Sequence, residues 1–155
     1  MNSMVRQMCE IGDFVRRMRV QVRFGTLSRA PLKLLRLELR EGVVECDWLA
    51  RAPDEWDIHL PAGVGERNAS LQALEDAVDV RNLLFSTMPG LSSGVFRVYR
   101  QTGGEQPALI MTGAARREER VPTAVRSLAM RAKLAGFRFW LADGVLKSLQ
   151  LENST

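Results

Sequence analysis

Apolar and polar side chains alternate along most of residues 32–40 and again along most of residues 43–51. A period of two places successive side chains on opposite faces of a strand, so each segment predicts a strand with one buried face. Glu41-Gly42 between them has the composition of a two-residue turn, and the two segments therefore predict a β-hairpin. The side chains expected to face inward are Leu35, Leu37, Leu39, Val44, Cys46 and Trp48.

Three further segments show the same alternation. Residues 15–24 place Met18, Val20 and Val22 on one face and arginines on the other, which predicts an N-terminal strand. A second hairpin is expected within residues 95–112, with its turn at the Thr-Gly-Gly sequence that begins at residue 102. A third is expected within residues 137–151, around the strong turn signal Asp-Gly at 143–144.

Two segments have helical spacing instead. Residues 70–86 carry an apolar stripe opposite acidic side chains, and residues 122–135 begin with Pro122 and end before Gly136. The predicted fold is a single α+β domain: an antiparallel sheet of about seven strands, made of three hairpins and the N-terminal strand, with two helices packed on one face.

The chain has the length and composition of one domain. Its 155 residues are 46% apolar, which is enough to bury a core. We expect residues 1–14 to form an N-terminal extension, either poorly ordered or helical, and residues 15–155 to form the domain. A hairpin followed by a helix occurs at 32–87 and at 95–136, which indicates either an internal duplication or the chance recurrence of a common arrangement.

The cysteines and the apolar segments bear on location. Cys9 and Cys46 form neither a disulfide framework nor a Cys-x-x-Cys pair. No window approaches the roughly 18 uninterrupted apolar residues of a membrane span, and charges interrupt the N-terminal segment where a signal peptide would need an apolar core. We therefore expect a cytoplasmic protein with no membrane contact and no cofactor.

The net charge of +4 is unevenly distributed. Residues 1–40 carry +6, residues 41–90 carry −7, and residues 91–155 carry +5. The positive charge is arginine-rich, with 22 basic residues of which only Lys33, Lys133 and Lys147 are lysines. An acidic middle between basic ends favours charge pairing within the chain or between subunits over binding to a uniform polyanion.

A proline- and glycine-rich loop over residues 52–67 contains the only histidine, His59. Asp54, Asp57 and His59 are candidate metal ligands, while His59, Asp57 and Cys46 are candidates for acid–base or nucleophilic chemistry. Their spacing matches no metal or nucleophile motif, so a solvated acidic loop is the favoured interpretation and an enzyme is the second alternative.

Nucleic-acid binding is the first alternative. Its candidate residues, on outward strand faces, are Arg17, Arg19, Arg23, Arg97 and Tyr99. A basic sheet surface suits a phosphate backbone, but single-strand readers stack bases on two or three aromatic rings and only Tyr99 is expected to face outward.

The leading hypothesis is a non-catalytic binding or protein-interaction module that self-associates through its sheet. The uncovered sheet face is expected to carry charges of both signs, which suits a protein partner or a second copy. Trp48, Trp56 and Trp140 are the candidate residues for a ligand or partner surface. Partners are therefore expected to be the chain itself, as a homodimer, or another protein.

Overall fold

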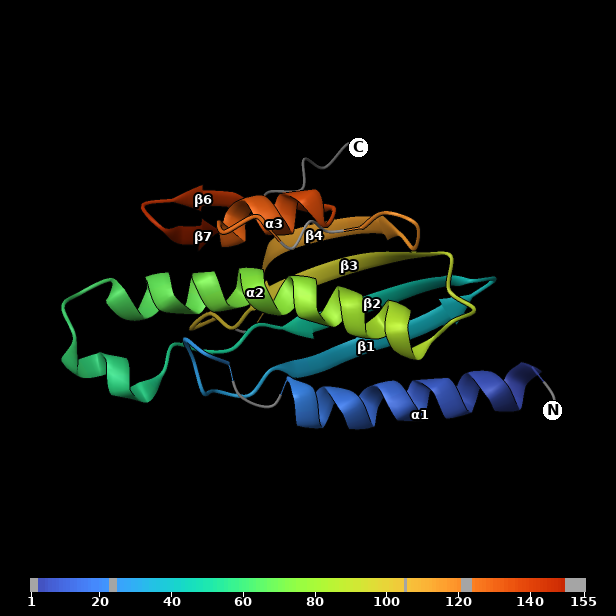
Figure 1. Ribbon diagram of the computed structural model, residues 1–155. Coiled ribbons are helices and arrows are strands. Elements are labelled where there is room, and N and C mark those ends of the chain that lie inside the picture. The colour runs from blue at the N-terminus through green and yellow to red at the C-terminus, as the bar shows by residue number, and fades with distance from the viewer. Residues whose placement is uncertain (1–2, 23–24, 105, 121–123, 150–155) are drawn as a thin grey trace.

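The computed structural model describes residues 3–22, 25–104, 106–120 and 124–149 (Figure 1). Its helices and strands follow one another along the chain in this order: α1 (Ser3–Gln21), β1 (Lys33–Arg40), β2 (Val43–Leu49), the 3-10 helix η1 (Glu55–His59), α2 (Val64–Thr87), β3 (Ser93–Arg100), β4 (Ala108–Arg116), α3 (Leu128–Leu134), β5 (Phe137–Arg138), β6 (Trp140–Ala142) and β7 (Val145–Lys147). The α+β class is confirmed. None of the described helices combines the length and apolar character needed to cross a bilayer.

The prediction of one antiparallel sheet of about seven strands is wrong in its topology. Five strands form a mixed sheet in the order β1-β2-β3-β4-β5, and β6 and β7 form a separate two-stranded sheet. β2 and β3 are parallel, with Cys46 opposite Phe96. Parallel neighbours need a long crossover, which α2 supplies, whereas alternation along a strand says nothing about the direction of its neighbour.

The N-terminal strand expected at 15–24 is also wrong, because the described part of this segment belongs to α1 and its C-terminal end. Phe14, Met18 and Val22 are spaced by four and are buried together in the core. Val20, expected on the same face as Met18, is instead 77% exposed. The apolar residues of this segment fit both the two-residue period of a strand and the 3.6-residue period of a helix. The helix is the more stable of the two because it buries Phe14 together with Met18.

The two-residue turns are confirmed. Glu41 and Gly42 have φ values of 49° and 80°, and Asp143 and Gly144 have 54° and 77°. Positive φ at both central positions matches the right-handed twist of the strands on either side. One register detail differs: a bulge between Leu34 and Arg36 leaves Leu35 48% exposed, and Leu34 takes the inward place opposite Trp48.

The second hairpin is confirmed as β3–β4, but the third divides between two sheets. β6 and β7 pair around the predicted turn, while β5 pairs with β4 through Gly113 and Phe137. A Cβ atom at Gly113 would lie 2.7 Å from the Phe137 ring, so glycine makes room for the ring against the sheet. This close contact allows β5 to pair with β4 in the main sheet.

Both predicted helices are present with different bounds. α2 begins at Val64, six residues before the predicted start, and ends as expected near Pro89. α3 is short and begins after Ser127, whose Oγ accepts a hydrogen bond from the Met130 N–H. The predicted start of that helix, Pro122, lies outside the described residues.

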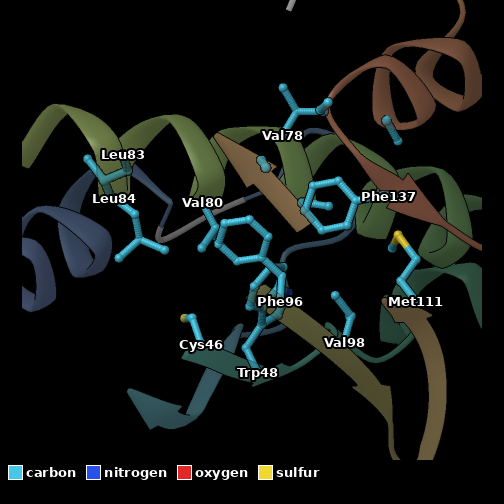
Figure 2. Close-up of a cluster of buried hydrophobic side chains, with 14 of the residues drawn as sticks. Cys46, Trp48, Val78, Val80, Leu83, Leu84, Phe96, Val98, Met111 and Phe137 are labelled. Carbon is cyan, nitrogen blue, oxygen red and sulfur yellow. The ribbon is translucent and has the colours of Figure 1, made fainter. Parts of the chain in front are cut away.

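The core lies between α2 and the sheet (Figure 2). Figure 2 shows the rings of Trp48, Phe96 and Phe137 meeting there. The Phe96 and Phe137 rings stack with centroids 5.5 Å apart, and Trp48 meets both edge-on. Since these rings come from β2, β3 and β5, their burial packs three strands of the sheet around one cluster.

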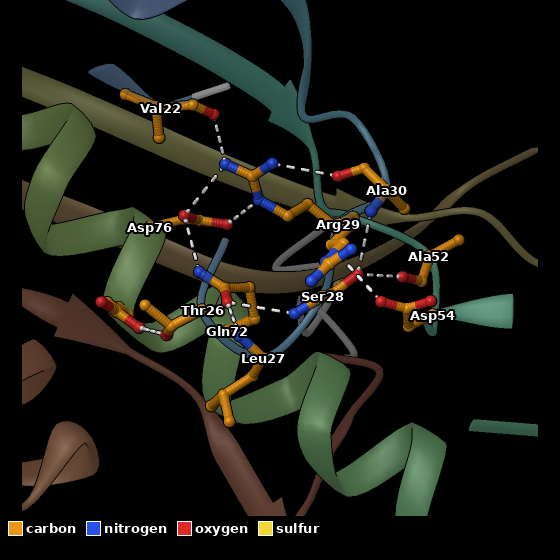
Figure 3. Close-up of polar contacts among 12 residues, drawn as sticks. Val22, Thr26, Leu27, Ser28, Arg29, Ala30, Ala52, Asp54, Gln72 and Asp76 are labelled. Atoms are coloured by element: carbon orange, nitrogen blue, oxygen red, sulfur yellow. Dashed lines mark hydrogen bonds and ion pairs between the residues drawn. The ribbon is translucent and has the colours of Figure 1, made fainter. Parts of the chain in front are cut away.

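A buried ion pair connects Arg51, which follows β2, to Asp76 on α2. Arg51 Nε donates to Asp76 Oδ2 at 2.7 Å, and both side chains are almost completely buried. The same guanidinium donates to the carbonyl oxygens of Val22 and Ala30. Gln72 donates to Asp76 and accepts from the N–H groups of loop residues 27 and 28, so the loop is held from two sides (Figure 3).

We expect Asp76→Asn to lower the free energy of unfolding by about 3 kcal/mol, because the variant leaves a buried Arg51 charge without its counter-ion. Glu75→Gln, at the neighbouring position, removes an exposed charge and keeps a side-chain oxygen that can accept from Thr26, so it should cost less than about 1 kcal/mol. Urea denaturation of both variants measures the difference. Equal losses in the two variants would contradict the role given to the ion pair.

A second prediction concerns Asp79, which lies three residues after Asp76 on α2. Partial burial of its carboxyl group and the neighbouring Glu75 and Asp76 raise its pKa to about 6. A raised carboxyl pKa means that the folded state binds the proton more tightly, so the contribution of Asp79 to stability falls as the pH rises from about 4 to about 6. Asp79→Asn should therefore be no less stable than the natural chain at pH 7. The difference in the free energy of unfolding between the variant and the natural chain should shrink towards pH 4. Denaturation at a series of pH values measures this difference. A difference that stays constant with pH would contradict the raised pKa of Asp79.

Candidate functional site

The acidic loop candidates shape η1 and do not gather around a common point. Asp54 caps η1 by accepting from the Trp56 N–H, and it also accepts from the Arg29 N–H. Asp57 accepts from the Asn68 side-chain amide. In the part of the chain that the structure describes, no three His, Cys, Asp or Glu side chains come together as a metal site, so Asp54, Asp57 and His59 do not form one.

The candidate nucleophile Cys46 lies in the core, on the inner face of β2. Its side chain is fully buried, and burial raises its pKa above the usual thiol range, with a further contribution from the Asp47 charge. A thiol with a raised pKa is not a nucleophile at neutral pH. His59 lies on the exposed η1, and the described structure forms no catalytic pair from Cys46 and His59.

The two cysteines should differ sharply in reactivity, because Cys9 is exposed on α1. A thiol-specific reagent added to the folded protein should modify one thiol rapidly, and the second only after denaturation. The Cys9→Ser variant should show no rapid phase. Rapid modification of that variant would show that Cys46 is reachable.

The tryptophans do not converge on a cavity. Trp48 is completely buried beneath α2, whereas Trp56 on η1 and Trp140 on β6 are 70% and 60% exposed. Trp48 therefore belongs to the core, and the other two lie on separate surface elements. No shared ligand surface made from the three indoles is present among the described residues.

The arginines proposed for nucleic-acid binding lie on different elements. Arg17 and Arg19 are on α1, where Arg17 pairs with Asp13. Arg97 and the half-buried Tyr99 are on β3. Arg23 lies outside the described residues. These side chains are divided between a helix and a sheet. They therefore do not form the basic strand face that the alternation of residues 15–24 predicted.

The uncovered face of the sheet carries charges of both signs, as expected, and they pair with one another inside the chain. Arg36 lies 2.8 Å from Glu38 and 3.0 Å from Glu45, and Arg97 lies 3.4 Å from Asp47. The hydrogen bond and charge of Arg36 lower the pKa of Glu38. Since each acidic side chain here already has an arginine partner, the face has little net charge left to attract a polyanion.

A groove of about 750 Å³ lies between α1 and the start of β1. α1 and the residue that follows it contribute Val15, Met18, Arg19, Val20 and Val22, and the opposite wall is formed by Pro31, Leu32, Lys33 and Leu34. β1 is an edge strand, and Figure 1 shows α1 running beside it. The groove thus combines an apolar floor with a strand whose outer edge has no neighbouring strand in the described sheet.

The charges of the groove have one sign. Arg19 and Lys33 lie on opposite walls and are exposed, and no acidic residue contributes to the lining. Seven of the nine lining residues are apolar. The site therefore suits a ligand that combines apolar side chains with negative charge.

Sequence reasoning missed this groove because it assigned residues 15–24 to a strand. As a strand, Val20 would face inward with Met18; as part of α1, it stands exposed at the groove. One signal was present: apolar residues at positions 4, 8, 11, 15, 18 and 22 follow the spacing of a helix that packs along one side.

Comparisons of this chain with protein-family models, with curated proteins and with solved structures find no match.

Proposed function

We propose that this protein is a non-catalytic protein-binding module, and that the groove between α1 and β1 receives an extended, apolar and acidic segment of a partner protein. The observation that carries the proposal is the apolar groove beside an edge strand, with Arg19 and Lys33 on its two walls.

The edge strand determines the shape of the partner. An exposed sheet edge presents unpaired N–H and C=O groups, and an extended peptide satisfies them by adding a strand. Alternate side chains of that peptide would enter the groove, where Val15 and Leu34 offer apolar contacts. The side chains between them would point away from the groove.

The basic walls determine the charge of the partner. Arg19 and Lys33 are exposed, so each contact with a carboxylate contributes a modest free energy and mainly steers association. A protein segment fits this groove better than a nucleic acid, because the remaining lining is aliphatic and offers no aromatic ring on which a base stacks.

The test uses the full chain and a displayed library of random peptides of about ten residues, long enough to pair with the eight residues of β1. Selected peptides should be enriched in aliphatic and acidic residues. The double variant Arg19→Glu/Lys33→Glu should bind the best selected peptide at least about tenfold more weakly, because two attractive charges become repulsive.

Two further variants locate the contact. Val20→Glu changes an exposed groove residue and should also weaken binding without affecting folding, whereas Arg126→Glu reverses an exposed charge before α3 and should leave the affinity unchanged. Calorimetric titration gives the affinities. Selected peptides without acidic residues, or equal affinities for the groove and control variants, would refute the proposal.

A further inference from the structure

The 3-10 helix η1 and the residue after it present three large apolar side chains to solvent. Trp56, Ile58 and Leu60 are 70%, 80% and 46% exposed, and no residue of η1 is buried. Local hydrogen bonds hold the turn, since the N–H groups of Asp57 and Leu60 donate to carbonyl oxygens three positions earlier. A short 3-10 helix that buries no side chain gains little from packing, so this segment can adopt another backbone conformation at small cost.

The same segment has the side-chain alternation of a strand. Its large apolar residues occupy positions 56, 58 and 60, and polar residues occupy the positions between them. Asp54 and Leu60, at its two ends, already have extended backbones, with ψ values of 134° and 164°. Pro53 and Pro61 lie just outside, and proline ends strand pairing because it has no N–H donor. Residues 54–60 therefore form one unit that can pair as a strand.

The charge of this segment distinguishes it from the other exposed apolar surfaces. Residues 52–66 contain four acidic residues and no lysine or arginine. The other large apolar side chains that are exposed in the described structure lie on α1, β1, α3 and β6, and each has a lysine or arginine within two positions along the chain. Among the described residues, only this segment combines exposed large apolar side chains with purely acidic charge.

These properties match the groove between α1 and β1. The groove lining is apolar apart from Arg19 and Lys33, and the eight residues of β1 offer an edge long enough for residues 54–60. In Figure 1 the blue-green turn of η1 lies beyond the C-terminal end of α1, whereas the groove lies along that helix. This separation favours the groove of another copy over the groove of the same chain.

We propose that the groove receives residues 54–60 of a second copy of this chain, which add as a strand to the edge of β1. Trp56, Ile58 and Leu60 of one copy enter the apolar groove of the other. The acidic side chains of the segment come close to Arg19 and Lys33, so the charges across the contact attract. This inference rests on the proposed function, because it names the occupant of the same groove.

The contact joins two different surfaces of the chain, so one copy supplies the segment and the other supplies the groove. So short a segment buries less surface than the roughly 1,600 Å² of a standard protein–protein interface. The paired charges are exposed, and each contributes a modest free energy. Association should therefore depend on concentration, with a dissociation constant in the micromolar range or above.

Sedimentation equilibrium of the full chain over about 5 to 500 µM tests the proposal. The mass should rise above 17.4 kDa as the concentration increases. The double variant Trp56→Lys/Ile58→Lys should weaken association at least about tenfold, because it replaces two apolar contacts with charges of the same sign as the groove walls. A mass that stays at 17.4 kDa throughout would overturn the proposal.

The matched control is Met130→Lys/Trp140→Lys, which makes similar changes at sites that are 49% and 60% exposed on α3 and β6. It should associate like the natural chain. All four positions are exposed, so both double variants should keep the circular dichroism spectrum of the natural chain. Association that survives the change at η1, or that the control abolishes equally, would refute the assignment to residues 54–60.

Mixing two variants identifies the surfaces that meet. Arg19→Glu/Lys33→Glu keeps the natural segment, and Trp56→Lys/Ile58→Lys keeps the natural groove. Neither variant should associate alone at concentrations where the natural chain does. The mixture should form a complex of one copy of each, because it brings together a natural segment and a natural groove. A mixture that stays monomeric while the natural chain associates would refute the contact.

The selected peptide separates this inference from the peptide-binding function. At concentrations where the natural chain is monomeric, Trp56→Lys/Ile58→Lys should bind the peptide as tightly as the natural chain does. Tighter binding would place the segment in the groove of its own chain and overturn the contact with a second copy. A natural chain that binds the peptide and never associates would overturn this inference alone. Association without any selected acidic peptide would instead overturn the function of binding other proteins.

Discussion

The arrangement of the N-terminal third of this protein depends on the buried contact between Arg51 and Asp76. Arg51 follows β2 and Asp76 lies on α2, so the pair first joins the sheet to the helix that crosses it. The remaining guanidinium hydrogens then bind the carbonyl oxygens of Val22 and Ala30, at the two ends of the loop between α1 and β1. A charge buried at this depth is tolerated only when its hydrogen-bonding groups are satisfied, and satisfying them places α1 beside the sheet edge.

The groove is a consequence of that placement. The loop of residues 25–32 holds α1 alongside β1, while Phe14 and Met18 enter the core, Val15 packs against it from the groove and Val20 remains exposed. A helix lying against an edge strand cannot hydrogen-bond to that edge, because its own backbone groups are satisfied internally. The result is an apolar wall facing an edge that can still accept a strand, and both features of the proposed docking site follow from one polar network.

At the other end of α2 a second arginine has a comparable function. Arg117 donates to the carbonyl oxygens of Phe85, Met88 and Leu91, and so satisfies backbone acceptors that the end of the helix leaves open. Several arginines of this arginine-rich chain therefore stabilise the fold from within, and others pair on the sheet face. Net charge alone would have assigned them to an anionic partner, whereas their contacts pair Glu45, Asp47 and Asp76 of the acidic block at residues 41–90 with arginines inside the molecule.

The sequence by itself determined the features that depend on local geometry. The turns at Glu41-Gly42 and Asp143-Gly144, the hairpins β1–β2 and β3–β4 and the helical character of residues 70–86 follow from backbone conformations and side-chain periods that neighbouring residues impose. Only the tertiary structure decided that residues 15–21 are helical, that β2 and β3 run parallel, and that Arg51 meets Asp76 across 25 positions. It also separated the three tryptophans and the candidate arginines. In each case the outcome depends on burial shared between segments distant in the sequence, where a local pattern allows two structures and the packing free energy selects one.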